Sequence, residues 1–252
     1  MIIEGRNAVA EALRARMPLK RIAISSTPEP GGEGPIAEIE RLARAAKVRV
    51  ERVPKRDLDR ASERGAHQGV IAEAASYQFS SLTDIIAATA RADSALVVVL
   101  DHVTDPGNLG AIARTAEVVG AAGLVVPKRR SAAITPAAWK AAAGALAHVA
   151  IAQEANVVQS LARLKDAGYW VSGAAGEAQQ VVWDAPLTGK IALVVGSEGD
   201  GLARLTRESC DFLVRLPQAG KVGSLNVAQA TTAIAYEWLR RAQASSAGDQ
   251  SE

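Results

Sequence analysis

Three short blocks of small and polar residues, each placed after an apolar run, constrain this fold more than any other feature. Such residues end strands and let a ligand lie against the backbone, so three of them at strand ends predict one composite pocket in an open α/β sheet. The blocks are 105–110, which follows an apolar run at 96–100, then 196–199 after 191–195, and 223–228 beyond Leu216-Pro217.

The bulk composition favours a folded chain with no strong bias toward a charged partner. The 252 residues are 48% hydrophobic, which is enough to fill the core of one large or two modest domains. The 29 basic and 27 acidic side chains leave a net charge of +2. Residues 1–75 carry +3 (14 Lys and Arg against 11 Asp and Glu), so a preference for nucleic acid would rest mainly on this front segment.

The cysteine and histidine content argues against disulfides and metal sites. Cys210 is the one cysteine, and the three histidines lie far apart in the sequence, so no metal is expected. No apolar leader opens the chain, and no apolar stretch approaches the roughly 20 residues that a membrane-spanning helix needs. These features predict a cytoplasmic protein that does not enter a membrane.

Periodicity predicts a small α/β domain over residues 1–75, followed by a linker at 76–93 with a short helix near Ile85. A turn rich in glycine and proline is expected at 27–35. The expected helices are 4–16, one beginning at Ile36, and 55–62, and the expected strands are 21–24, 48–53 and 67–74.

A second domain, over residues 94–252, alternates strand and helix patterns and is predicted to form a mostly parallel sheet flanked by helices. The residues after Ala242 are expected to fray. The predicted strands are 96–100, 123–126, 149–152, 169–173, 191–195 and 212–216, and the predicted helices are 108–120, 136–145, 157–168, 202–209 and 227–242.

Two common nucleotide-binding motifs are missing from the places where they would be needed. The loop after the strand at 96–100 reads DHVTDPG, without the glycine pattern of a dinucleotide-binding fold. The Gly-Lys pairs at 189–190 and 220–221 lack the rest of a phosphate-binding loop. A dehydrogenase and an NTPase are therefore both disfavoured.

In order and spacing, the blocks resemble the three motifs of SPOUT-class (SpoU/TrmH type) RNA ribose 2'-O-methyltransferases. The matching segments are 108–116 (NLGAIARTA), 196–199 (GSEG), and 216–217 (LP) with 224–227 (SLNV). The front segment, with GRNAV at 5–9 and HQGV at 67–70, is similar to the ribosomal-protein-like substrate-binding domain of the 23S rRNA guanosine branch. Asn7 stands where that branch usually has histidine.

The resemblance implies a C-terminal domain tied in a trefoil knot, with S-adenosylmethionine bound in a bent pose by the loops at the strand ends. It also implies a homodimer that acts on RNA, with a guanosine of 23S ribosomal RNA as the favoured substrate. The implied cofactor-binding residues are Gly196, Gly199, Leu216, Pro217, Ser224 and Leu225.

The reaction implied is the attack of a ribose 2'-oxygen on a sulfonium methyl group, without a covalent intermediate. Such a reaction needs an aligned geometry and help in removing the hydroxyl proton. The family places Arg114 beside that hydroxyl, and because a guanidinium stays charged, we expect Arg114 to stabilise the nascent alkoxide rather than act as a base. The implied catalytic residues are Asn108, Arg114, Glu198, Ser224 and Asn226.

Taken singly, these residues have ordinary explanations: Asn226 could cap the last helix, and Arg114 could be a solvated helix residue. The run Lys128-Arg129-Arg130 fits either a solvated loop or a contact with RNA phosphates. Two other functions also fit the motifs. One is methylation of a transfer RNA or of another ribosomal site, and the other is a non-catalytic RNA-binding role in ribosome assembly.

Overall fold

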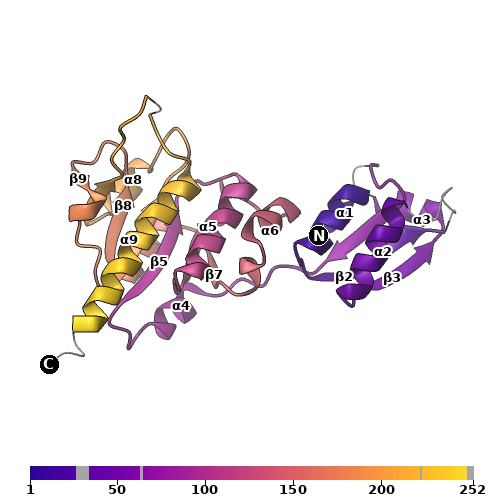
Figure 1. Cartoon of the computed structure of the whole chain (residues 1–252), viewed down its shortest axis with the longest axis horizontal. Helices are drawn as coiled ribbons and strands as arrows, with labels where there is room; N and C mark the ends of the chain where they lie inside the picture. Colours follow the sequence, from indigo (N-terminus) through magenta and orange to yellow (C-terminus); the bar gives the residue numbers. More distant parts are fainter. Residues whose placement is uncertain (27–33, 63–64, 222, 249–252) are drawn as a thin grey trace. The chain divides into compact units, whose positions relative to one another are not determined.

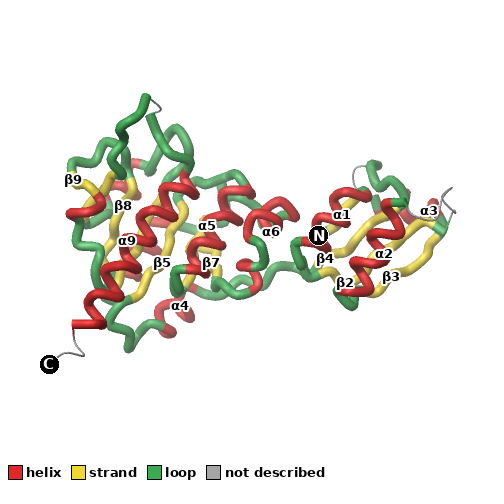
Figure 2. The backbone as a smooth tube through the Cα atoms, viewed as in Figure 1, coloured by secondary structure: helices red, strands yellow, loops and turns green. Residues whose placement is uncertain are grey.

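The computed structural model describes residues 1–26, 34–62, 65–221 and 223–248, which fold into two units. The first unit comprises residues 1–78 and 134–144, and the second comprises 79–133 and 145–252 (Figures 1 and 2). Most of the turn predicted at 27–35, namely residues 27–33, lies outside the described residues. Residues 134–144 lie between two segments of the second unit in the sequence, but they contribute a helix to the first unit.

The first unit is a four-stranded mixed sheet, in the order β1-β4-β2-β3, with helices packed on it. The helix α1 buries Val9, Ala12 and Leu13, and it packs against α2 and α6. Lys140 of α6 donates a hydrogen bond of 2.7 Å to Glu11 of α1. The elements are β1 (Ile2–Glu4), α1 (Arg6–Arg14), β2 (Leu19–Ser25), α2 (Pro35–Ala45), β3 (Arg49–Val53), α3 (Lys55–Ala61), β4 (Val70–Ala74) and α6 (Pro136–Ala142).

The two sequence motifs of the front segment meet where β1 turns into α1. Gly5, at φ +93°, donates its N–H to the carbonyl of Val70 at 3.2 Å, and Arg6 Nε donates to the carbonyl of Gln68 at 2.9 Å. His67 is buried, with its Nδ1 accepting from the N–H of Gly69. The predicted helix at 4–16 is thus partly wrong, because residues 2–4 form a strand and the glycine turn delays the helix to Arg6.

The second unit is built on seven parallel strands in the order β7-β6-β5-β10-β8-β11-β9. β5 and β6 are buried along their whole length, as expected for central strands covered on both faces. The predicted parallel sheet is confirmed, and its carboxyl ends share one edge. The strands are β5 (Ala95–Leu100), β6 (Gly123–Pro127), β7 (Ile151–Glu154), β8 (Trp170–Ala174), β9 (Gln180–Val181), β10 (Lys190–Val195) and β11 (Phe212–Arg215).

Helices cover both faces of this sheet. α4 and α7 pack on the face that includes Val97, Val99 and Val125, and α5 and α9 pack against each other, side by side in Figure 1. Hydroxyls of Thr115 in α5 and Thr232 in α9 lie 2.7 Å apart in that contact. The helices are α4 (Leu82–Ala88), α5 (Pro106–Val118), α7 (Val157–Asp166), α8 (Arg204–Glu208) and α9 (Val227–Gly248), with 3-10 turns at Ala145–Ala147 and Val182–Asp184.

The end of the chain differs from the prediction. The last helix continues to Gly248, because the residues after Ala242 contain no proline and no glycine before that point. None of the described helices combines the length and the apolar character needed to cross a membrane. The trefoil knot stays a prediction.

A buried glutamate in the middle of α9, Glu237, is paired with two arginines and provides a test of this helix. Hydrogen bonds from Arg240 lower the pKa of Glu237 to about 2, against the opposing effect of burial and with further help from Arg241. Because its folded pKa lies below the ordinary value of 4.5, the ionised group stabilises the fold above that pH. This stabilisation is lost as the pH falls through about 2.

We therefore expect Glu237→Gln to lower the free energy of unfolding by about 2 kcal/mol at pH 7, since its two arginine partners lose their charged acceptor. Thermal unfolding of the wild-type chain and of Glu237→Gln at pH 7 and pH 3 measures this. The gap between the two proteins should narrow at the lower pH, and a gap of constant size would contradict the account.

Candidate functional site

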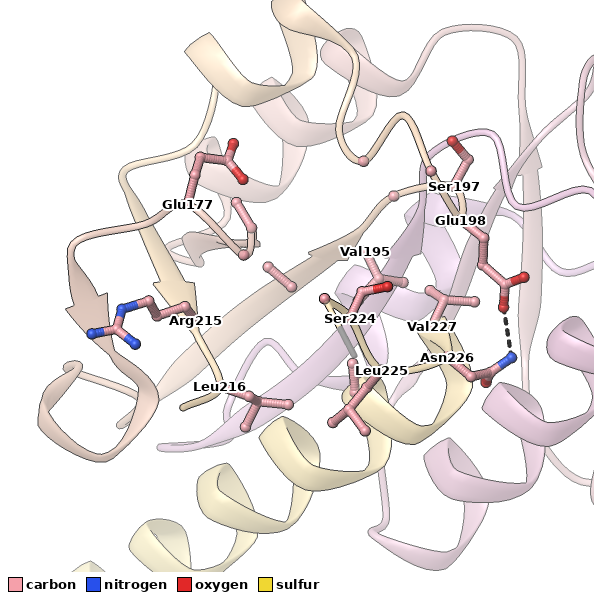
Figure 3. Close-up of a pocket in the computed structure, with 18 of the residues that line it drawn as sticks. Glu177, Val195, Ser197, Glu198, Arg215, Leu216, Ser224, Leu225, Asn226 and Val227 are labelled. Carbon is pink, nitrogen blue, oxygen red and sulfur yellow. Dashed lines mark hydrogen bonds between the residues drawn. The ribbon is translucent and has the colours of Figure 1, made fainter. Parts of the chain in front are cut away.

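The carboxyl edge of the seven-stranded sheet carries a cavity of about 740 Å³. Its wall comes from the loops that follow β8, β10 and β11 and from the start of α9 (Figure 3). The volume is in the range of small-molecule sites. The lining residues include Ala174–Glu177, Val195–Gly201, Arg207, Val214–Leu216, Gln218, Gly223–Val227, Ala230 and Ile234.

The loop after β10 is a tight turn that only small residues can form. Ser197 and Gly201 exchange two backbone hydrogen bonds of 3.1 Å, and Gly199 and Gly201 have φ of +98° and +66°. A Cβ on Gly196 would lie 2.2 Å from the carbonyl carbon and oxygen of Gly201. The first glycine is therefore required by the close approach of two backbone segments, and the others by their left-handed conformation.

A buried carboxylate fixes the base of this loop. Asp101, at the end of β5, is fully buried, and its Oδ2 accepts a 2.8 Å hydrogen bond from the N–H of Ala203. Its Oδ1 lies 2.6 Å from Nδ1 of His102. Because a buried carboxylate without partners would be costly, these bonds hold the end of β5 and the residues after Gly201 together.

Three residues from three distant motifs join at one end of the cavity. Asn226 Nδ2 donates to Glu198 Oε1 at 2.6 Å and to Asn108 Oδ1 at 2.9 Å, and Asn108 Nδ2 donates to the same Glu198 oxygen at 3.0 Å. Figure 3 shows the first of these bonds as a dashed line. We call this set, Asn108, Glu198 and Asn226, the polar junction.

The ends of two helices position the polar junction. Asp105 caps α5 by accepting from the N–H of Asn108 at 2.7 Å. Asn226 caps α9, because its Oδ1 accepts from the N–H groups of Ala228 and Gln229 at 2.9 and 3.3 Å. The side chain of Asn226 thus serves as a helix cap with its oxygen and as a member of the junction with its nitrogen.

The opposite end of the cavity carries charges. Glu177 and Arg207 form an ion pair there, and Arg215 projects from the end of β11 (Figure 3). Between the two ends lie the side chains of Leu216 and Leu225. The cavity therefore combines an apolar middle with polar groups at both ends.

The predicted site residues are distributed unevenly around this cavity. Gly196, Glu198, Gly199, Leu216, Ser224, Leu225 and Asn226 all line it. Pro217, Arg114 and Asn108 are not among the residues that line the cavity. Asn108 contacts the lining through its hydrogen bond to Glu198. Arg114 is exposed, about 12 Å along α5 from Pro106, and its side chain forms no hydrogen bond or ion pair with the described residues.

The structure adds lining residues that the motifs did not single out. They are the small residues after β8, from Ala174 to Gly176, with Glu177, Arg207 and Arg215. The run Ala174-Ala175-Gly176 after an apolar strand is the same kind of signal as the three blocks. The charged residues carried no such signal, because their position depends on how the loops meet.

Cys210 is not among the residues that line the cavity. Burial raises the pKa of the Cys210 thiol to about 12, so this thiol stays protonated at neutral pH. Across the described ranges, no group of three or more His, Cys, Asp and Glu residues is arranged to hold a metal ion. Trp238 is buried, and its Nε1 donates to the carbonyl of Gly189 at 3.3 Å.

Comparison with known proteins places this site in a family. The model of the SpoU rRNA methylase family matches residues 95–236, more than half of the chain. The chain belongs to this family. In this SpoU methylase, a second model, for RNA 2'-O ribose methyltransferase substrate binding, matches residues 2–80. The catalytic family match thus contains the whole polar junction.

Relatives of this SpoU methylase agree over almost its whole length. A 23S rRNA (guanosine-2'-O-)-methyltransferase RlmB of Pseudomonas syringae is 40% identical over 96% of both chains. The enzyme of the same name from Pseudomonas putida is 43% identical over 80% of this chain and 82% of its own. The SpoU methyltransferase AviRb of Streptomyces viridochromogenes, solved in complex with the cofactor AdoMet, has a TM-score of 0.65 and 26% identity, covering 95% of this chain and 89% of its own.

Proposed function

We propose that this protein transfers a methyl group from S-adenosylmethionine to a ribose 2'-hydroxyl of RNA, with a guanosine of 23S ribosomal RNA as the favoured target. The observation that carries the proposal is the polar junction, which gathers one residue from each of three motifs at one end of a glycine-lined cavity. The activity of the RlmB relatives, at 40% identity and above, supports the substrate class.

The residues of the cavity fit S-adenosylmethionine. Gly196 lies where any side chain would meet backbone, so the wall of the cavity there is bare backbone, and Leu216 and Leu225 offer an apolar surface suited to an adenine. Gly199 and Ser224 complete the lining that we propose holds the cofactor, and Pro217, next to Leu216, would stiffen the turn out of β11. When bound, S-adenosylmethionine supplies a methyl group made electrophilic by its sulfonium charge.

The residues of this chain would align and activate the ribose. The junction holds Glu198 through its Oε1, and Oε2 accepts no hydrogen bond from the described residues. We propose that Glu198 Oε2 accepts a hydrogen bond from the ribose hydroxyl, while Asn108 and Asn226 keep the carboxylate in place. Ser224, beside them in the lining, would help to orient the ribose.

Arg114 would act as a fixed cation and stabilise charge that develops on the ribose oxygen. It is exposed and without a partner in the described part of the chain, so it is available to an RNA phosphate or to a second subunit. We propose a homodimer as the working form, and the exposed Val118 of α5 and Tyr236 of α9 support an apolar contact there. Ribosomal RNA is the favoured substrate, so the predicted cytoplasmic location belongs to this proposal.

Calorimetry with S-adenosylmethionine, followed by mapping of 2'-O-methyl groups in ribosomal and transfer RNA from cells with and without the gene, tests the function. Micromolar uptake of the cofactor and one missing methyl group in 23S ribosomal RNA are the expected results. A folded chain that takes up no cofactor would exclude the proposal, and a missing methyl group in transfer RNA would move the substrate.

Replacing Arg114 by alanine should lower the turnover number by at least about tenfold, because a positive charge near the nascent alkoxide is lost. Single-turnover methyl transfer at saturating RNA measures this, with calorimetric binding of the cofactor as the control for an intact pocket. Arg114→Ala with unchanged turnover would remove Arg114 from the proposed chemistry.

A further inference from the structure

The loop that follows β6 displays three consecutive cations. Lys128, Arg129 and Arg130 are all exposed, and within the described ranges none of their side chains takes part in a hydrogen bond or an ion pair. Exposed cations are often paired with neighbouring carboxylates, so the partners of the carboxylates near this loop matter.

The nearest carboxylate in the sheet register is committed elsewhere. Glu154 of β7 pairs in register with Pro127, directly before the basic run. Its side chain accepts from Arg163 Nη1 at 3.4 Å, and Arg163 Nη2 donates to Thr83 Oγ1 at 2.8 Å. Glu154 therefore forms its ion pair with Arg163 and none with the three cations of the loop.

The loop is held in place by bonds at both of its ends. The N–H of Lys128 donates to the carbonyl of Glu154 at 2.8 Å, and Ser131 Oγ donates to the carbonyl of Pro127 at 2.5 Å. The N–H of Ala132 donates to the carbonyl of Val103 at 2.8 Å, which ties the loop to the segment after β5. A loop fixed in this way presents its charges in a defined position, as a binding surface requires.

Both segments contain a residue with a side chain and a positive φ, two of six such residues in the described part of the chain. Arg130 has φ of +54°, and His102, next to Val103, has φ of +60°. Left-handed conformations are uncommon for residues with a side chain and concentrate at functional sites. These two residues lie in the two loops that the hydrogen bond from Ala132 to Val103 connects.

The position of the loop relates it to the polar junction. β6 lies next to β5, which leads to Asn108, and β5 lies next to β10, which leads to Glu198. Neighbouring strands are about 4.8 Å apart, so the ends of β6 and β10 are separated by about 10 Å along the edge. A strand of RNA with one ribose at the junction could therefore place an adjacent phosphate at this loop.

We propose that Lys128, Arg129 and Arg130 bind backbone phosphates of the RNA strand next to the nucleotide that is methylated, and so position its ribose at the polar junction. The inference rests on the proposed function for the identity of the reacting ribose. Guanidinium groups suit phosphate because they can donate two parallel hydrogen bonds, and the contacts carry no base specificity.

The test compares Lys128→Gln/Arg129→Gln/Arg130→Gln with Arg91→Gln. Arg91 is a matched control because it is exposed, has no bond to any described residue and precedes β5, at the opposite edge of the sheet. Binding of an unmodified 23S ribosomal RNA transcript is measured as a function of salt. Each phosphate contact to a single strand contributes about 0.7 to the slope of log K against log salt, so the triple variant should lose about 2.

Further measurements separate this inference from the proposed function. Calorimetric binding of S-adenosylmethionine and the thermal midpoint should match the wild-type chain, while KM for RNA rises and the turnover number at saturating RNA is kept. A triple variant with the slope and KM of Arg91→Gln overturns the inference, whatever the activity of the wild-type chain.

If the wild-type chain takes up no S-adenosylmethionine, the proposed function fails, and a loss of salt slope in the triple variant still supports the phosphate-binding loop. If the triple variant does not fold, Arg129→Gln alone provides the comparison with Arg91→Gln. It should lose about 0.7 of slope, and an unchanged slope would overturn the inference.

Discussion

Replacing Gly196 with alanine is expected to weaken binding of S-adenosylmethionine by at least about tenfold and to lower the free energy of unfolding by about 1–3 kcal/mol. The added methyl carbon would lie 2.2 Å from backbone atoms of Gly201 and 2.6 Å from the nitrogen of Leu202. These atoms cannot easily move away, because Gly201 exchanges backbone hydrogen bonds with Ser197. The N–H of Ala203, two residues further on, donates to the buried Asp101. Calorimetry and thermal unfolding measure the two effects.

Gly220→Ala is the matched control for this change. Gly220 is exposed, lies outside the cavity lining, and has no atom within 4 Å of the position of an added Cβ. We expect it to keep both the affinity for the cofactor and the thermal midpoint. Wild-type affinity in Gly196→Ala would mean that the loop adapts to a side chain and that its backbone does not form the wall of the binding site.

Replacing Asn226 with serine should lower the turnover number by about a hundredfold with little change in thermal stability, because misplacement of an aligned group by about 1 Å has an effect of that size. Serine caps a helix about as well as asparagine. It has no amide nitrogen to donate to Glu198 and Asn108, so the carboxylate is released. Single-turnover methyl transfer and thermal unfolding together measure the change.

Asn156→Ser provides the comparison for a cap alone. Asn156 caps α7 by accepting from the N–H of Gln159 at 3.2 Å, and no bond links it to the polar junction. This variant should keep the wild-type turnover number. If Asn226→Ser also keeps the wild-type turnover number, with or without a lower thermal midpoint, Asn226 acts only as a helix cap.

The sequence predicted the parallel sheet of the second unit because its strands are continuous apolar runs that end in turn residues. The strand at 95–100, buried at every position, is the clearest case. Short elements were missed where pairing, not composition, defines them. β1 has three residues and depends on β4, and β9 has two residues and depends on β11.

The candidate site was predictable as far as its residues lie in motifs. Seven of the predicted residues line the cavity, because strand ends in a parallel sheet meet at one edge. Arg215 and Glu177 were not predicted, since nothing in the order of residues shows which loops face each other. The double use of Asn226 was also hidden, because the sequence offers a cap and a site residue as alternatives, whereas one amide can serve both purposes with its two ends.

The helix α6 has a consequence for how this chain becomes folded during synthesis. The first unit includes residues 134–144, whose Trp139 is buried, so part of the unit has not been made when only residues 1–78 have left the ribosome. α1 packs against α2, β1 and β4 as well, but the part of it that packs against α6 is covered only after β5, α5 and β6 have been made. A cut of the gene at residue 78 would therefore separate α1 from α6, and completion of the first unit follows the translation of the first strands of the second.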